Sequence, residues 1–236
     1  MVLYIYGERV LLLITLSIYG LLRGKGMFVP KGKGDLQLKR VEIADLRPTQ
    51  ITIGKIAAKN KADKLGRMKN EFELVDFMRS HPIPAVIGPH NKYFITDHHH
   101  LCHAATQQDI KYAYVIIEGD YSYMTKKDFW KALQGKQWAY PVDEDGTLHE
   151  VDKIPKKFED LKDDPYRSVA TFVRDSGSFD KTPTAFAEFK WAEFFRKHIP
   201  IEMIQDNFNK AVAFGCSLAH DPSASELPGY INKEEL

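Results

Sequence analysis

Residues 93–117 read YFITDHHHLCHAATQQDIKYAYVII and carry the pattern that decides the fold. Apolar residues at 93–95 and at 112–117 predict two short strands. The residues between them have helical spacing, and Thr96 or Asp97 is the expected N-cap, because either side chain can accept from free amides at a helix N-terminus. The stretch therefore predicts a helix that begins where a strand ends, with histidines in its first turn.

The flanking residues extend this stretch into an α+β unit over residues 36–118. Alternating apolar side chains predict a strand that ends at the Arg47-Pro48 turn. A helix with one buried face follows, and residues 88–91 have the composition of a hairpin turn. The predicted elements are a strand over 36–46, a helix over 71–80 and hairpin arms at 85–87 and 93–95.

Beyond residue 119 the pattern becomes mainly helical, which predicts a helical C-terminal portion over residues 119–236. Three segments have helical spacing, and a charged stretch between them is expected to be a loop with short turns. Trp191 and the phenylalanines around it are typical of core packing. The predicted helices cover 126–133, 165–173 and 184–198, and the predicted loop covers 143–164.

The composition is that of a folded protein. Of the 236 residues, 44% are hydrophobic and 28% are charged, which excludes disorder and low-complexity filaments. The two cysteines, Cys102 and Cys216, cannot build a disulfide scaffold or a four-cysteine zinc site. Any metal would therefore need histidine and carboxylate ligands.

The net charge of +1 is unevenly distributed along the chain. Residues 23–69 hold thirteen Lys and Arg against four Asp and Glu, and the residues after them are acidic overall. A basic segment before an acidic body indicates a partner with phosphates, which could be a nucleotide, a nucleic acid or another phosphorylated ligand. The alternative is a solvated, lysine-rich surface, because the segment lacks the interleaved aromatic residues that stack on bases.

Residues 10–22 form a stretch of thirteen uncharged residues that is too short to span a bilayer comfortably. The stretch has the length of a signal-peptide core, but it lacks a small-x-small cleavage site and a cationic flank. We therefore expect residues 1–26 to be an apolar leader or a spurious N-terminal extension of a cytoplasmic protein. The alternative is membrane anchoring or export through residues 1–26, with membrane contact only through residues 10–22.

The densest group of chemically active side chains lies at residues 97–103. Four of the nine histidines of the chain fall within six residues, directly after an apolar strand. Imidazole at a helix N-terminus can bind a phosphate as a cation, shuttle a proton or ligate a transition metal. The alternative is a structural helix whose histidines satisfy one another and the backbone. The cluster consists of Asp97, His98, His99, His100 and His103.

A divalent metal is one possible cofactor of this cluster. Its candidate ligands are Asp97, His99 and His103, because the two histidines are four residues apart and share one face of the predicted helix. Adjacent histidines on one turn cannot all point at one ion, which limits the ligand set. Two hypotheses therefore remain for this cluster, namely a metal site and the binding of a phosphate without a metal.

Four segments are informative beyond their periodicity: VEIADLRPTQ (41–50), residues 93–117, DPYRSVATFVRDSG (164–177) and FAEFKWAEFFR (186–196). Together they resemble the ParB/sulfiredoxin superfamily, and most closely its ParB-like nuclease branch. The resemblance implies a ParB/sulfiredoxin-like α+β domain over 36–118 with a mainly helical C-terminal extension. It also implies a helix N-terminus at which amides and basic side chains hold nucleotide phosphates.

Three positions depart from better-understood relatives. Leu101 occupies the position of a phosphate-gripping arginine, and His99 occupies that of the sulfiredoxin nucleophilic cysteine, so sulfiredoxin chemistry is not expected. Gln50 occupies the position at which free-serine kinases carry a catalytic glutamate. A glutamine cannot take a proton from a hydroxyl, which weighs against kinase activity.

Further phosphate contacts are expected outside the histidine cluster. The resemblance places substrate contacts at Arg47, Thr49 and Gln50. Arg167 and Arg174 are seven residues apart on one predicted helix face. Either arginine could bind the phosphate in place of the arginine that Leu101 replaces. The alternative is that both arginines form ordinary ion pairs with neighbouring aspartates. These aspartates are Asp163, Asp164 and Asp175.

We predict phosphate-ester chemistry by a ParB-like nuclease or another nucleotide- or phosphate-ester-processing hydrolase. The alternatives are a free amino-acid kinase of the serine type and a non-catalytic module that binds a nucleotide or a nucleic acid. The predicted roles are orientation of the cluster by Asp97, acid, base or phosphate binding by His99 or His100, phosphate contact by His98 and His103, and charge neutralisation by Arg47 or Arg167.

Overall fold

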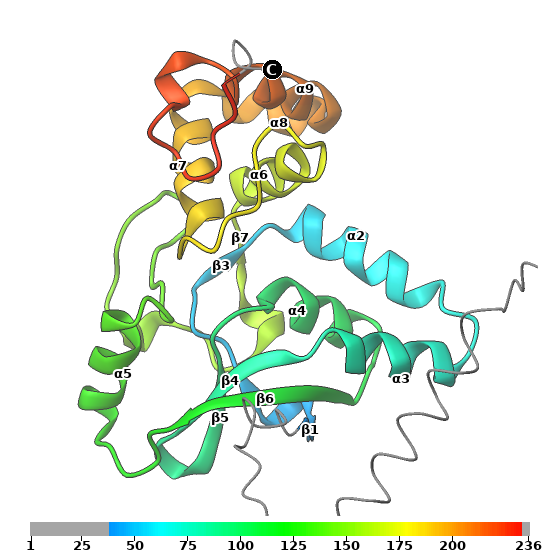
Figure 1. Ribbon diagram of the computed structural model, residues 1–236, viewed down its shortest axis with the longest axis vertical. Coiled ribbons are helices and arrows are strands. Elements are labelled where there is room, and N and C mark those ends of the chain that lie inside the picture. The colour runs from blue at the N-terminus through cyan, green and yellow to red at the C-terminus, as the bar shows by residue number, and fades with distance from the viewer. Residues whose placement is uncertain (1–37, 233–236) are drawn as a thin grey trace, which may run out of the picture. The chain divides into compact units, whose positions relative to one another are not determined.

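Strand β4 (Ile83–Gly88) lies at the centre of a five-stranded mixed sheet in the computed structural model, which describes residues 38–232 (Figure 1). It pairs in parallel with β6 (Tyr112–Asp120) and antiparallel with β5 (Lys92–Ile95). The sheet is completed by β1 (Lys39–Glu42), antiparallel to β6, and by β2 (Leu46–Arg47), parallel to β5. The short strands β3 (Thr52–Ile53) and β7 (Lys162–Asp163) pair in parallel outside this sheet.

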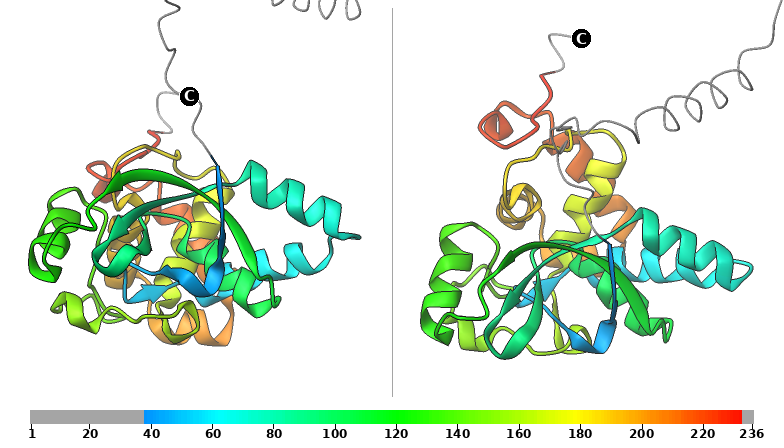
Figure 2. Two further views of the ribbon diagram at one scale, coloured as in Figure 1. Left: turned by 90° about the horizontal axis from the view of Figure 1, so that it is seen from below. Right: turned by 60° about the horizontal axis from the view of Figure 1, so that its bottom comes forward.

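Three helices cover one face of the sheet, namely α2 (Lys55–Gly66), α3 (Glu71–Ser80) and α4 (His99–Gln107). Successive strand residues point to opposite faces, so Ala85 packs toward these helices while its neighbour Val86 packs on α5 (Lys126–Gly135). Figure 2 shows α5 at one end of the sheet and α2 with α3 at the other.

The remaining helices form a second core around Trp191. These helices are α6 (Pro165–Asp175), α7 (Ala187–His198), α8 (Ile201–Asp206) and α9 (Phe208–Leu218). The Trp191 ring stacks on Phe179 at a centroid distance of 4.1 Å, which fixes the segment between α6 and α7. Short 3-10 turns lie at Ile43–Asp45, Pro89–Asn91, Val151–Lys153, Phe158–Asp160 and Pro222–Ala224.

The predicted α+β class and the mainly helical C-terminal part are confirmed. The predicted strand over 36–46 is wrong for the described residues, because a 3-10 turn at Ile43–Asp45 divides it into β1 and β2. The turn buries Ile43 and moves the chain from one edge of the sheet to the other. Alternating apolar residues fit one long strand or two short ones equally well, so the pattern could not distinguish them.

Helix α2 was not predicted, and its composition explains why. Its buried side chains are mostly alanines, Ala57, Ala58 and Ala62, with Leu65 at the end. Alanine provides little contrast between an apolar and a polar face, although it is the best helix former. The segment therefore has strong helix propensity but a weak amphipathic pattern.

Two helices begin later than predicted. Helix α4 begins at His99 rather than at Asp97, because its N-cap residue is His98 in a left-handed conformation with φ of 66°. Helix α7 begins at Ala187 rather than at Thr184, because Phe186 has φ of 58°. Positive φ is uncommon for residues other than glycine and is not a helical conformation, so each helix begins only after this residue.

The predictions for residues 1–26 lie outside the described residues. All residues from 38 to 232 belong to one compact unit, and a boundary between 36–118 and 119–236 stays a prediction. Within this part of the chain no helix combines the length and the apolar character needed to cross a membrane.

A test of this packing uses Gly54, which precedes α2 at its contact with α6. A Cβ atom there would lie 2.5 Å from the Ser168 backbone nitrogen and 2.9 Å from the Arg167 carbonyl carbon. We expect Gly54→Ala to lower the free energy of unfolding by about 1–3 kcal/mol in chemical denaturation. Gly135→Ala is the matched control, because a Cβ at Gly135 meets no atom within 4 Å. Equal stabilities of the two variants would contradict the close contact of α2 with α6.

Candidate anion-binding site

A pocket of about 480 Å³ opens where the sheet unit meets α6 and α7. Its walls come from the loop after β2, the first turn of α4, residues 137–140, α6 and the segment 179–189. The predicted site residues Thr49, Gln50, Asp97, His99, His100, Arg167 and Arg174 all line it.

Two backbone-to-imidazole hydrogen bonds hold the histidines that line this pocket. Because β2 pairs in parallel with β5, the residues that follow each strand lie side by side. His99 Nε2 accepts from the Thr49 N–H at 3.0 Å, and His100 Nε2 accepts from the Gly54 N–H at 3.0 Å. Thr49 Oγ1 also donates to the Ile95 carbonyl at 2.8 Å. These bonds tie the first turn of α4 to the loop after β2 and to the start of α2.

The same bonds hold both imidazoles neutral. A ring nitrogen that accepts a hydrogen bond carries no proton, so each neutral ring keeps its proton on Nδ1. Burial, with the charge of Arg167 adding to it, lowers the pKa of His99 to about 3 and that of His100 well below its ordinary value. The expectation of a cationic imidazole is wrong for these two residues, which are N–H donors at neutral pH.

The N-terminus of α4 has free backbone donors. The N–H groups of His99, His100 and Leu101 have no acceptor among residues 38–232, and the N-cap His98 makes no side-chain cap. Such amides carry partial positive charge and favour an anion. Asp97 Oδ1 accepts from the His98 N–H at 2.6 Å. Among the described residues its carboxylate makes no hydrogen bond to an imidazole, so the orienting role predicted for it is not seen as a hydrogen bond.

Arg167 is the most unusual side chain of the pocket. It is 4% exposed and charged, yet its guanidinium makes no hydrogen bond or ion pair with any described residue, and Nε and Nη1 are buried without partners. It lies 3.5 Å from the centroid of the Phe189 ring, a cation-π contact. Burial lowers its pKa to about 10, which leaves it charged at neutral pH. Gln50 also lines the pocket and is 5% exposed, and its amide nitrogen Nε2 has no partner among the described residues.

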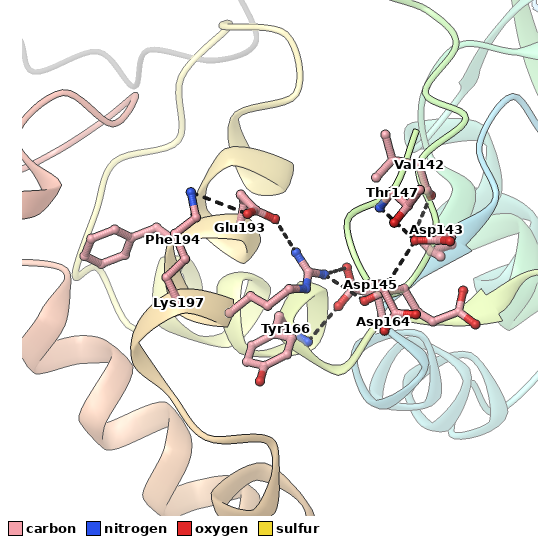
Figure 3. A network of polar contacts seen from close by, with 12 residues as sticks. Val142, Asp143, Asp145, Thr147, Asp164, Tyr166, Glu193, Phe194 and Lys197 are labelled. Carbon is pink, nitrogen blue, oxygen red and sulfur yellow. Dashed lines mark hydrogen bonds and ion pairs between the residues drawn. The ribbon is translucent and has the colours of Figure 1, made fainter. Parts of the chain in front are cut away.

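The nearby Asp164 does not pair with Arg167, because other groups use both of its oxygens. Oδ1 accepts from the Tyr166 N–H at 3.0 Å and caps α6, while Oδ2 accepts from Arg196 at 2.7 Å. Arg196 also donates to Glu193 at 2.6 Å, so it joins α7 to the start of α6. Figure 3 shows this network around Asp164 and Glu193. The expected local ion pair of Arg167 with Asp164 is therefore not formed.

Three other residues that were predicted to contact a phosphate already have partners within the protein. Arg174 lines the pocket, but it forms ion pairs with Glu188 and with Asp175. Arg47 donates to the carbonyls of Ala44 and Leu46 and lies outside the pocket lining.

His103 also lies apart from the pocket, since its Nδ1 donates to the Phe158 carbonyl at 2.7 Å and Gln107 contacts its Nε2. Asp97, His99 and His103 are thus not brought together. Among residues 38–232 no three His, Cys, Asp or Glu side chains are placed to hold a metal ion.

Several pocket residues were not predicted. Tyr140 packs on Phe186 and Phe189 at centroid distances of 4.5 and 4.0 Å, and all three line the pocket rather than the core. Glu118, at the end of β6, also lines it and accepts from the Thr96 hydroxyl at 2.7 Å. No sequence signal indicated Tyr140, because its place depends on a bridge to Gln50 that joins distant segments.

The fold and pocket define an α+β protein with a pocket at a helix N-terminus that is lined by hydrogen-bond donors. The chain belongs to the family described as "Putative ParB-like nuclease", which matches residues 39–197. It is also similar to the crystal structure of protein Atu1540 from Agrobacterium tumefaciens, with 33% sequence identity and a TM-score of 0.77. That similarity covers 83% of this chain and 96% of the other. No curated protein matches the chain.

The neutral His99 predicts a specific pH dependence of stability. Its folded pKa of about 3 lies below the ordinary value of 6.5, so the unfolded chain takes up a proton first as the pH falls below 6.5. His99→Gln keeps an acceptor for Thr49 but cannot titrate there. We expect the stability of the parent relative to this variant to fall by about 2 kcal/mol between about pH 7.5 and pH 5. Chemical denaturation measures both proteins at both pH values. If the difference between their free energies of unfolding is the same at about pH 7.5 and pH 5, His99 is not neutral and buried.

Proposed function

We propose that the pocket binds the phosphate group of an ester and that the protein processes phosphate esters. The observation that carries this proposal is the charged guanidinium of Arg167, which is buried without a hydrogen-bonding partner. Leaving such a group unpaired costs several kcal/mol unless a ligand supplies the anion. Arginine recognises phosphate oxygens through paired N–H donors.

The proposed binding mode uses donors from three parts of the chain. Arg167 and the Gln50 amide hold the phosphate oxygens, and the free amides at the start of α4 complete the site. The Nδ1–H groups of His99 and His100 are further donors, because their Nε2 atoms accept from the backbone. Thr49 positions the His99 ring rather than the ligand. These preorganised donors would stabilise charge that develops on the phosphate in the transition state.

Proton transfer is assigned to Asp97 and not to a histidine. The Nε2 atoms of His99 and His100 are occupied, whereas Asp97 lines the pocket and only one of its oxygens accepts a hydrogen bond. A carboxylate in that place can accept a proton from an attacking water or hydroxyl. A divalent metal stays a further proposal, with Asp97 and Glu118 as the carboxylates that could share it with a ligand phosphate.

A specific observation also supports the serine-type kinase as a second candidate. Gln50 cannot act as a base, but the carboxylates of Asp97 and Glu118 line the same pocket. A kinase of this kind would transfer phosphate from ATP or ADP to free serine, whereas a hydrolase would release it to water. Assaying both reactions with and without magnesium separates the two candidates.

Arg167→Gln tests the binding step. We expect this variant to weaken binding of short single-stranded oligonucleotides by about tenfold or more, the scale of a charged hydrogen bond. Arg174→Gln is the matched control on the same helix, since Arg174 is already paired with Glu188. Calorimetry measures both affinities, and equal losses in the two variants would contradict the assignment of Arg167.

Asp97→Asn separates catalysis from binding. We expect the variant to retain the affinity of the parent for these oligonucleotides but to lose about 10²- to 10⁴-fold in hydrolysis rate, the contribution of a positioned base. Full activity in the variant would exclude Asp97 as the proton acceptor. An inactive parent protein that still binds these ligands through Arg167 would support the non-catalytic binding module instead.

A further inference from the structure

The charges around the pocket limit the charge of the group that it can hold. Seven charged residues line it, of which three are cations and four are carboxylates. Arg174 is neutralised by Glu188 and Asp175, and Lys181 is exposed to solvent. Arg167 is thus the single buried cation of the lining without an ion pair among the described residues. The full set is Asp97, Glu118, Arg167, Arg174, Asp180, Lys181 and Glu188.

The histidines add donors to the pocket but no charge. Each Nε2 accepts from a backbone N–H, so protonation of either ring would break the bond that fixes the first turn of α4. Of the cations on the surrounding elements, Arg196 pairs with Asp164, and Lys61 on α2 is exposed to solvent and interacts electrostatically with Asp175. The other charged or titratable neighbours of these rings and of Arg167 are His98 and Tyr140.

We propose that the pocket is selective for a singly charged phosphate group, so that it takes a phosphodiester and discriminates against the dianion of a phosphomonoester. This inference rests on the proposed function and narrows its substrate class to diesters. A diester carries one negative charge, which Arg167 alone balances, while neutral N–H donors satisfy its remaining oxygen atoms. The second charge of a monoester dianion would meet Asp97 and Glu118. The other cation of the lining without an ion pair among the described residues, Lys181, is exposed to solvent, which screens its charge.

The experiment compares two small ligands of nearly equal size on the full chain. Dimethyl phosphate is a monoanion at every pH used, whereas methyl phosphate gains its second charge with a pKa of about 6. Chemical-shift titrations in EDTA-containing buffer would measure both dissociation constants at about pH 5 and pH 8. Dimethyl phosphate reports any change in the protein itself, so the ratio of the two constants isolates the charge on the ligand.

We expect the ratio of the methyl phosphate constant to the dimethyl phosphate constant to rise about tenfold between pH 5 and pH 8. A rise smaller than about threefold, no change or a fall would overturn the inference while leaving phosphate binding intact. If neither ligand binds at either pH, the proposed function fails, and the inference fails with it.

Glu118→Gln tests the electrostatic explanation, because the amide oxygen can still accept from Thr96 while the charge is lost. We expect this variant to strengthen binding of the methyl phosphate dianion more than binding of dimethyl phosphate at about pH 8, and so to bring the two dissociation constants closer together. A difference that stays the same as in the parent would contradict the role of the carboxylates in selecting the ligand charge.

Discussion

The structure depends on two hydrogen bonds in which backbone N–H groups donate to histidine rings. Thr49 donates to His99, and Gly54 donates to His100, so one turn of α4 holds the loop after β2 and the start of α2. The same bonds leave the rings neutral and direct their remaining donors away from the backbone. Architecture and electrostatics are therefore set by the same atoms, and protonating these rings would disturb both.

A second constraint acts from the C-terminal helices. Arg196 on α7 and the Tyr166 amide occupy both oxygens of Asp164, which leaves Arg167 on the next turn of the chain without a local carboxylate. Packing on Phe189 retains the guanidinium at the pocket wall. Burying an unpaired cation reduces stability, and such costs are typical of sites that bind a ligand of opposite charge. The unpaired Arg167 is therefore consistent with the proposed binding of an anion and contributes no ion pair to stability among the described residues.

Most of the fold, and the gathering of several candidate residues at one pocket, could be predicted from the sequence, but the charge state of these residues could not. The helix at 71–80 and the hairpin could be predicted because periodicity and turn residues are local signals. The break at Ile43–Asp45 could not, because the choice between one strand and two depends on pairing with distant strands. Similarly, the histidine motif indicated the pocket, whereas neutral imidazoles and the free Arg167 result from tertiary partners at Thr49, Gly54 and Arg196.

The most direct test of the central claim is a crystal structure of the protein with dimethylarsinate, a tetrahedral oxyanion whose arsenic atom is located by anomalous scattering. The account predicts an arsenic peak in the pocket, with oxygen atoms within about 3 Å of the Arg167 guanidinium and the Gln50 amide. An empty pocket with Arg167 paired to Asp97 or another carboxylate of the chain would contradict it.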